Sequence, residues 1–222
     1  MTDAVQLAPD RSAVLRWAVL LSVATVGWNI VEGVVAVVAA AGAHSVALLG
    51  FGIDSFVETA SGAVVGWRML VELRARSADA AAQAEQIERI ERRASRIAGA
   101  LLLALAVYIL ADAGRRLVGF GDEPSRSFLG IALTAISLIV MPLLGWAKLR
   151  TARQLDSRAL RADAFETVTC AWLSVTTLAG LVLNATLGWW WTDPLAALVM
   201  VPLLVREGLE AWRGETCCEH EA

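Results

Sequence analysis

Long runs of apolar residues dominate this sequence, and several are about as long as a helix that crosses a bilayer, roughly 20 residues. Hydrophobic residues make up 57% of the chain, above the roughly 45–50% typical of soluble domains. The strand alternation of a transmembrane barrel is absent. We therefore predict an all-α polytopic membrane protein with six transmembrane helices. Their predicted ranges are 14–41, 45–70, 95–118, 128–149, 159–183 and a last one that begins at Trp189 or Thr192 and ends at Arg206.

The remaining segments are short. The first apolar run lacks the basic flank and small-residue cleavage site of a signal peptide, so we expect it to be retained. Residues 1–13 then form an N-terminal segment, 14–212 one transmembrane domain and 213–222 a short tail. Residues 71–95 are rich in Ala, Glu, Gln and Arg without Pro or Gly, which predicts a helical connection outside the bilayer. Its acids are interleaved with its arginines, which argues against nucleic-acid binding.

Basic residues are distributed unevenly between the two sets of predicted connections. Of the 19 Lys and Arg residues, only Arg115, Arg116 and Arg126 fall on the connections opposite the termini. Many of the others flank the second and fourth connections: Arg68, Arg74, Arg76, Arg89, Arg92, Arg93, Arg96, Lys148, Arg150, Arg153, Arg158 and Arg161. Because positive charge accumulates on the cytoplasmic side, we expect both termini to be cytoplasmic.

Two carboxylates interrupt the second apolar run. Asp54 and Glu58 are four residues apart, so they share one face of a helix with Cβ atoms about 5–6 Å apart. Each charge costs about 2.5–3.5 kcal/mol at the bilayer centre on insertion scales. A purely structural polar contact is the alternative, but no Lys or Arg partner is evident at that depth. The pair therefore indicates a bound cation.

The fifth run carries a matching set. Glu166 and Cys170 are also four residues apart, with Asp163 one turn earlier. If this face packs against the second helix, the four side chains of Asp54, Glu58, Glu166 and Cys170 converge, and three carboxylates with a thiolate suit a tetrahedral divalent metal. Metal ligands must be deprotonated, so metal binding would release protons. This is the chemistry that a metal–proton antiporter needs.

Three more polar residues within the runs are candidates for an additional ligand or a proton relay. Asn29 and Glu32 lie on the first predicted helix, and Asp163 lies near the start of the fifth. The alternatives are structural: Asn29 and Glu32 in contact with each other, and Asp163 as a helix cap near the membrane surface beside Arg161.

Other features have structural interpretations. Asp112 lies near the outer end of the third run and is followed by two arginines, so we expect an interfacial ion pair. Gly62 and Gly66 form a GxxxG pattern that predicts close helix packing. The three tryptophans at 189–191 match an interfacial aromatic belt.

The tail contains a second group of potential metal ligands. Cys217 and Cys218 are adjacent and His220 follows shortly after them. Thiols and an imidazole suit capture of a soft or borderline metal, but the spacing matches no structural zinc site. A tail with incidental cysteines is the alternative.

The helix motifs resemble those of the cation diffusion facilitator family. In that family a Ser and a DSxxD-type acid pair lie on the second helix, as Asp54 and Glu58 do here. An Ala-Asp dipeptide followed by HxxxD marks the fifth helix, and Glu166 and Cys170 stand at those two ligand positions. The Thr-Asp-Pro segment at Asp193 is similar to the entry to the sixth helix. The resemblance implies a homodimeric, proton-driven exporter of divalent metals in the membrane, which would be the inner membrane of a bacterium.

The departures from the family pattern affect the expected metal and the expected dimer. Zn²⁺ is the expected substrate, but a carboxylate at Glu166 also suits Mn²⁺ or Fe²⁺, and a thiolate at Cys170 favours softer ions such as Cd²⁺, with Co²⁺ a further candidate. The family's C-terminal cytoplasmic domain and His-rich loop are missing from the sequence, so we expect the dimer to form through membrane helices. Two other hypotheses remain: a non-transporting metal-binding or sensing protein, and a membrane thiol enzyme, for which no CxxC motif is present.

Overall fold

The computed structural model describes residues 11–74, 80–120 and 123–213, and the described part consists of six α-helices without a strand. The all-helical prediction is therefore confirmed. The predicted metal-binding tail, Cys217, Cys218 and His220, lies outside the described residues. The helices are α1 (Arg11–Ala43), α2 (Val46–Arg74), α3 (Ala80–Leu117), α4 (Phe128–Leu155), α5 (Arg158–Leu187) and α6 (Thr192–Arg213).

Four of the described helices, α1, α2, α4 and α5, are long and apolar enough to cross a membrane. The outer surfaces of α3 and α6 also carry large exposed apolar side chains, among them Val107 and Leu110 on α3 and Val199 on α6. The largest differences from the predicted boundaries are the start of α3 at Ala80 and the ends of α4 and α6, at Leu155 and Arg213. Outward apolar faces of this kind suit contact with hydrocarbon rather than water.

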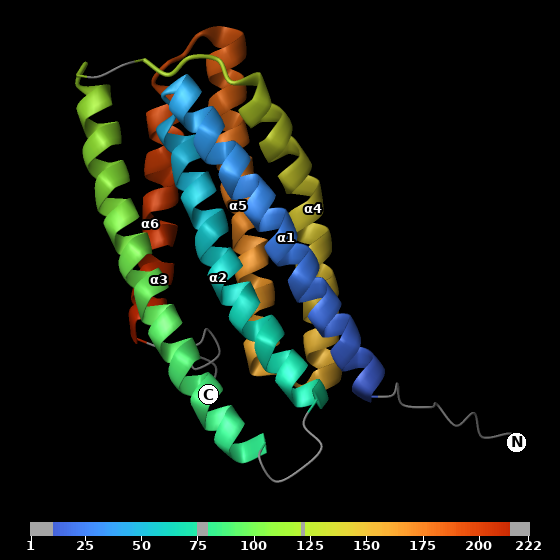
Figure 1. The fold of residues 1–222 in the computed structure, drawn as a ribbon. Coiled ribbons are helices and arrows are strands. Elements are labelled where there is room, and N and C mark those ends of the chain that lie inside the picture. Colours follow the sequence, from blue (N-terminus) through green and yellow to red (C-terminus); the bar gives the residue numbers. More distant parts are fainter. Residues whose placement is uncertain (1–10, 75–79, 121–122, 214–222) are drawn as a thin grey trace, which may run out of the picture.

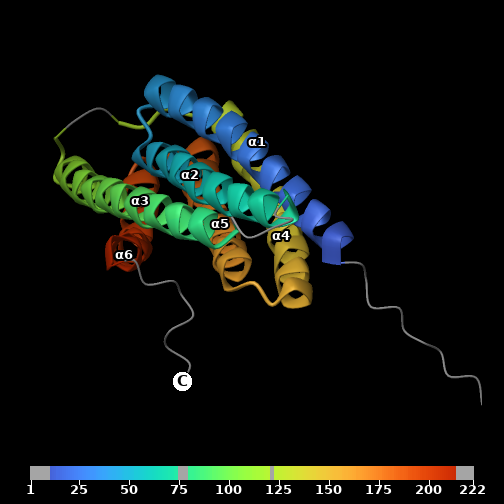
Figure 2. The ribbon, with the colours of Figure 1, turned by 60° about the horizontal axis from the view of Figure 1, so that its bottom comes forward.

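The helices form a bundle in which α2 and α5 are central (Figures 1 and 2). α2 contacts α1, α3, α5 and α6, whereas α5 contacts α4, α6 and α2. α1 crosses over α2 and α4, and α3 packs mainly against α6. α1 begins and α6 ends at the same end of the bundle, which we call the terminal end, and the opposite end is the loop end (Figure 1).

Local sequence explains the tight turn between α4 and α5. Asp156 ends α4 in the left-handed region at φ 50°, which Asp tolerates better than most residues. The next residue, Ser157, begins α5 as an N-cap, and its Oγ accepts a hydrogen bond from the backbone N–H of Leu160. Only these two cap residues separate the helices, so α4 and α5 lie side by side as a hairpin.

The predicted close packing at the GxxxG pattern is confirmed. A Cβ at Gly66 would lie 2.8 Å from the Cβ of Ser22 on α1, and one at Gly62 would lie 3.5 Å from Val26 Cγ2. On its other side, Gly62 is close to Asp163 Oδ1, at 3.4 Å from the same Cβ position. The two glycines thus bring α2 close to α1 and leave room for an acidic side chain from α5.

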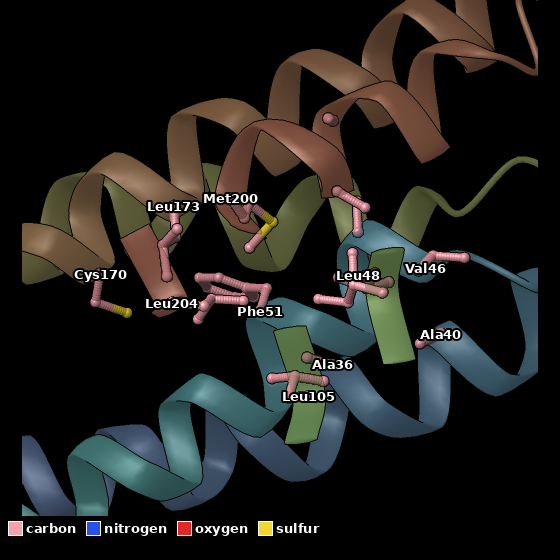
Figure 3. Packing of buried hydrophobic residues seen from close by; sticks show 14 of the residues in the cluster. Ala36, Ala40, Val46, Leu48, Phe51, Leu105, Cys170, Leu173, Met200 and Leu204 are labelled. Carbon is pink, nitrogen blue, oxygen red and sulfur yellow. The ribbon is translucent and has the colours of Figure 1, made fainter. Parts of the chain in front are cut away.

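Two apolar clusters hold the bundle together, and polar residues lie between them. The larger cluster includes Leu48 and Phe51 of α2 and Met200 of α6 (Figure 3). The smaller cluster, near the terminal end, includes Leu15 of α1 and Leu160 of α5. Along α1, α2, α4 and α5 the buried charged side chains lie between the residues of one cluster and those of the other. This arrangement forms a polar layer that is sealed by apolar packing on both sides.

Candidate functional site in the polar layer

Asp54 and Glu58 lie on the buried face of α2, at the start of the polar layer. Their exposed fractions are 6% and 4%. Glu58 Oε1 accepts a 2.6 Å hydrogen bond from Thr167 Oγ1 on α5, whereas Glu58 Oε2 has no hydrogen-bond partner. A buried carboxylate oxygen without a partner is energetically costly, so this side of Glu58 is suited to receive a cation.

Glu166 and Cys170 approach the same region from α5. Glu166 is half-buried and bonded to the Ser61 side chain, and its Oε2 has no hydrogen-bond partner. Cys170 is fully buried at the edge of the larger apolar cluster (Figure 3). Its Sγ lies 4.0 Å from Glu32 Oε2, and it also neighbours Glu58.

The four predicted ligands therefore lie on two helices that contact each other. Both Glu58 and Glu166 are acidic neighbours of Asp54. Among the described residues, however, no three His, Cys, Asp or Glu side chains are close enough together to hold a metal ion. Direct coordination by Asp54, Glu58, Glu166 and Cys170 would need these side chains to move closer, and their role as ligands stays a prediction.

Glu207 on α6 is a half-buried carboxylate that borders this layer and is not among the predicted site residues. Among the neighbouring acids, Glu207 has the strongest electrostatic effect on Asp54, and its side chain is hydrogen-bonded to that of Thr169 on α5. The predicted sixth span ended at Arg206, one residue too early to include it. Helical spacing offered the only signal: Glu207 lies seven residues, or about two turns, after the buried Met200, on the same face of α6.

Glu32 lies at the point where four helices meet. Its Oε1 accepts hydrogen bonds from Trp28 Nε1, at 3.3 Å, and from Ser137 Oγ on α4. Its Oε2 accepts a 2.9 Å bond from Ser55 Oγ on α2 and faces Cys170 on α5. Hydroxyl donors from two other helices, Ser55 on α2 and Ser137 on α4, thus stabilise the carboxylate.

Asn29, one turn before Glu32, makes no contact of the predicted kind. It is fully buried, and neither Nδ2 nor Oδ1 has a hydrogen-bond partner. The structural alternative, an Asn29–Glu32 contact, is therefore wrong, because donors on α2 and α4 satisfy the Glu32 carboxylate instead. An unsatisfied buried carboxamide is costly, so Asn29 stays a candidate additional ligand.

Lys148 and Asp163 form an ion pair inside the bundle, which corrects the predicted placement of Lys148 and excludes the helix-cap alternative for Asp163. Lys148 lies inside the bundle rather than beside a connection, and Asp163 does not cap α5, whose cap is Ser157. Lys148 Nζ lies 2.9 Å from Asp163 Oδ2, and both side chains are fully buried. Lys148 Nζ also donates a 3.0 Å hydrogen bond to Thr167 Oγ1. Among the described residues, Lys148 is the only buried basic side chain.

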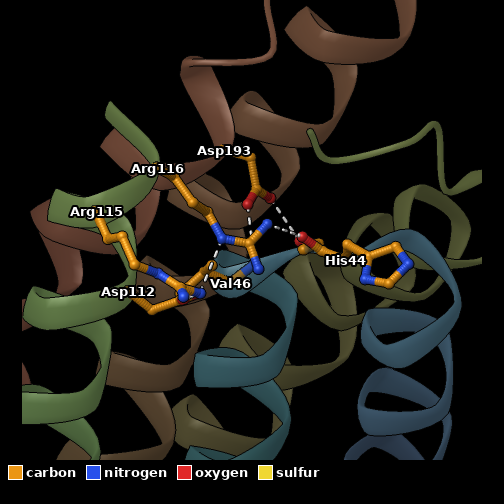
Figure 4. A network of polar contacts seen from close by, with 7 residues as sticks. His44, Val46, Asp112, Arg115, Arg116 and Asp193 are labelled. Carbon is orange, nitrogen blue, oxygen red and sulfur yellow. Dashed lines mark hydrogen bonds and ion pairs between the residues drawn. The ribbon is translucent and has the colours of Figure 1, made fainter. Parts of the chain in front are cut away.

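A second polar network lies at the loop end of the bundle (Figure 4). As predicted, Asp112 is ion-paired, at 2.8 Å to both Arg115 and Arg116. Arg116 also donates to the backbone carbonyl of His44, at 2.7 Å. We call this cluster, together with Asp193 and the start of α2, the loop-end network.

Asp193, at the start of α6, caps α2 within this network. Its Oδ1 accepts a 2.5 Å hydrogen bond from Ser45 Oγ, and its Oδ2 accepts one of 2.9 Å from the backbone N–H of Val46. A carboxylate suits the positive end of a helix dipole. The Thr-Asp-Pro segment therefore fastens α6 to α2 at the loop end.

Apolar helices around a layer of buried carboxylates define a helical membrane protein with an intramembrane polar site. The chain matches the cation efflux transmembrane domain over residues 18–213, and it belongs to this family. It is 33% identical over 155 residues, 69% of the chain, to an uncharacterized transporter of Synechocystis sp., covering 48% of that protein. It is 27% identical over 122 residues, 54% of the chain, to a cadmium, cobalt and zinc/H⁺–K⁺ antiporter of Bacillus subtilis, covering 38% of that protein.

A cadmium, cobalt and zinc/H⁺–K⁺ antiporter of Bacillus velezensis is 25% identical over 122 residues. The chain thus spans about half the length, or less, of the curated relatives that it matches.

Proposed function

We propose that this chain forms the membrane path of a proton-coupled transporter that exports Zn²⁺ or a similar divalent cation. The observation that carries the proposal is the accumulation of acids in the polar layer. Asp54, Glu58 and Glu32 are buried there, Glu166 and Glu207 border them, and Lys148 is their only buried basic counterpart among the described residues. Membership of the cation efflux family and the names of two relatives support a divalent substrate.

Proton coupling follows from the chemistry of the ligands. A carboxylate or thiol binds a metal only in its deprotonated form, so the arrival of the metal and the departure of protons are linked. The names of the two Bacillus relatives also mention K⁺, which makes a monovalent counter-cation a second element of the exchange to be tested.

Asp54, Glu58, Glu166 and Cys170 are the proposed metal ligands. Glu166 and Cys170 are the residues that would set metal preference, because a thiolate favours softer ions than a carboxylate does. The names of the two Bacillus relatives give cadmium, cobalt and zinc. Here Zn²⁺ is proposed first, with Cd²⁺, Co²⁺, Mn²⁺ and Fe²⁺ to be compared with it.

The proposed orientation places the terminal end of the bundle in the cytoplasm, because most Lys and Arg residues flank the connections at that end. A homodimer through membrane helices belongs to the same proposal. Reporter fusions at the two ends of the chain and crosslinking in native membranes test these two points separately from transport.

The decisive experiment is metal uptake into everted membrane vesicles with a pH-sensitive dye. Wild-type protein is expected to accumulate Zn²⁺ and to move protons the other way. Asp54→Ala should abolish both signals. Glu72→Gln is the matched control, since Glu72 is an exposed acid on the same helix and pairs with Arg11 at the surface. Unchanged transport by Asp54→Ala would overturn the site, and stoichiometric metal binding without uptake by wild type would favour a metal-binding or sensing protein.

A further inference from the structure

The buried ion pair between Lys148 and Asp163 has no evident structural purpose. Both side chains are completely buried and 2.9 Å apart. Removing two charges from water costs about as much as their mutual attraction returns, so a buried pair is weak evidence for stability. In membrane proteins, ionisable residues inside the bundle generally belong to ion pathways.

The position of Lys148 connects it to the proposed metal site. Its Nζ donates to Thr167 Oγ1 at 3.0 Å, and Thr167 Oγ1 lies 2.6 Å from Glu58 Oε1. The ammonium group is therefore separated from a proposed metal ligand by a single hydroxyl. Asp163 Oδ1 lies beside Gly62, 3.4 Å from the position of a Cβ there, and Gly62 follows Glu58 by one turn on the same face of α2.

The two atoms that contact the ammonium group are oxygens, the type of ligand that hard cations prefer. They are a carboxylate oxygen of Asp163 and the hydroxyl oxygen of Thr167. Lys148 reaches this position from α4, whereas both oxygens belong to α5. The cation is thus supplied by a neighbouring helix and cannot diffuse away.

We infer that Lys148 is a tethered counter-cation: its ammonium group takes the place at Asp163 and Thr167 that a free monovalent cation would otherwise occupy. The inference rests on the proposed transport function and concerns the same site. When the divalent ion has left, the tethered charge balances Asp163 directly and Glu58 through Thr167. Metal transport by this protein therefore needs no K⁺ or other free monovalent cation.

The test uses purified protein in proteoliposomes that contain either K⁺ or N-methyl-D-glucamine as the monovalent cation, at equal pH and ionic strength. Wild-type protein should transport Zn²⁺ at the same rate in both, within about twofold. Lys148→Gln keeps a donor for Thr167 but lacks the charge, so its rate without K⁺ should fall about tenfold or more. K⁺ or NH₄⁺, which fit the vacated position, should restore it.

Arg150→Gln is the matched control. It removes a positive charge from the exposed surface of the same helix, where Arg150 lies 5.7 Å from the ring centre of Trp146. Its rate should equal that of wild type in both cation solutions. Lys148→Gln that transports at the wild-type rate without K⁺ would overturn the inference, as would a folded Lys148→Gln that no monovalent cation restores.

A second measurement does not depend on any variant. Zn²⁺ affinity of the wild-type protein, measured by titration calorimetry, should differ by less than about twofold between K⁺ and N-methyl-D-glucamine solutions, because the position is already filled by Lys148. Competition by K⁺, or transport that stops without K⁺, would show an exchangeable cation and overturn the inference. Absence of transport by wild type under every condition would instead contradict the proposed function itself.

Discussion

The loop-end network and the polar layer are both built from buried charged and polar groups, yet they differ in how these groups are balanced. In the loop-end network, Asp112 meets two arginines and Asp193 meets a hydroxyl and a backbone N–H. In the polar layer, Glu58 and Glu166 each have a carboxylate oxygen without a hydrogen-bond partner. A network in which every polar group has a partner stabilises one conformation. A group of buried carboxylates that lack partners is destabilising until a cation binds to it.

The first prediction tests this contrast where it is largest. Asp54→Asn keeps the shape of the side chain and removes a charge from the acid-rich layer. Zn²⁺ transport should fall by about 100-fold or more, because a neutral amide is a poor metal ligand. The metal-free protein should be at least as stable as wild type, since one repulsive charge is gone. Vesicle uptake and thermal unfolding in detergent measure the two effects, and a variant that loses stability without metal would contradict this account of the layer.

The second prediction concerns the carboxylate on α6. Glu207→Gln should weaken Zn²⁺ transport about tenfold. Among the neighbouring acids Glu207 has the strongest electrostatic effect on Asp54, so its loss removes negative charge that attracts the metal. Glu210→Gln, one turn later on α6, is the control, since Glu210 pairs with the exposed Arg206 at 2.8 Å and should leave transport unchanged. Equal effects of the two substitutions on uptake would show that position on α6, not proximity to Asp54, matters.

The third prediction tests the loop-end network. Asp193→Asn weakens two charge-assisted hydrogen bonds to the start of α2 and should cost about 1–3 kcal/mol of unfolding free energy. The stabilisation by added Zn²⁺, measured as the change in unfolding temperature, should remain as large as in wild type. A variant that loses this Zn²⁺ response would show that the loop-end network takes part in metal binding.

The smallest expected effects concern helix packing beside the polar layer. Gly66→Ala places a Cβ 2.8 Å from Ser22 Cβ, and overpacking of this kind costs about 1–3 kcal/mol, with the lower part of that range expected here. Gly27→Ala on α1 meets nothing within 4 Å and should be neutral or stabilising, by up to about 1 kcal/mol. Thermal unfolding of both variants checks the difference, and equal costs would contradict the close packing at Gly66.

Much of the architecture could be predicted from local patterns. Apolar runs of membrane length located the helices, and a spacing of four residues correctly placed Asp54 with Glu58, and Glu166 with Cys170, on single helix faces. Helix ends were less certain, because hydropathy fades gradually while a helix continues into water. That is why the predicted sixth span stopped before Glu207.

Other features depend on how each helix is rotated against its neighbours, which no pattern within one helix records. Position in the sequence places Lys148 with the basic residues of a connection, yet its side chain pairs with Asp163 inside the bundle. Spacing along α1 allows a contact between Glu32 and Asn29, yet hydroxyls from α2 and α4 bind the Glu32 carboxylate.

The sequence by itself thus determined a helical membrane protein with acids on the inner faces of its second and fifth helices, because length, hydropathy and helical period are local properties. The tertiary structure alone decided which charges meet. Only the packing of α4 against α5, and of α6 against both central helices, places a lysine and a further carboxylate beside those acids.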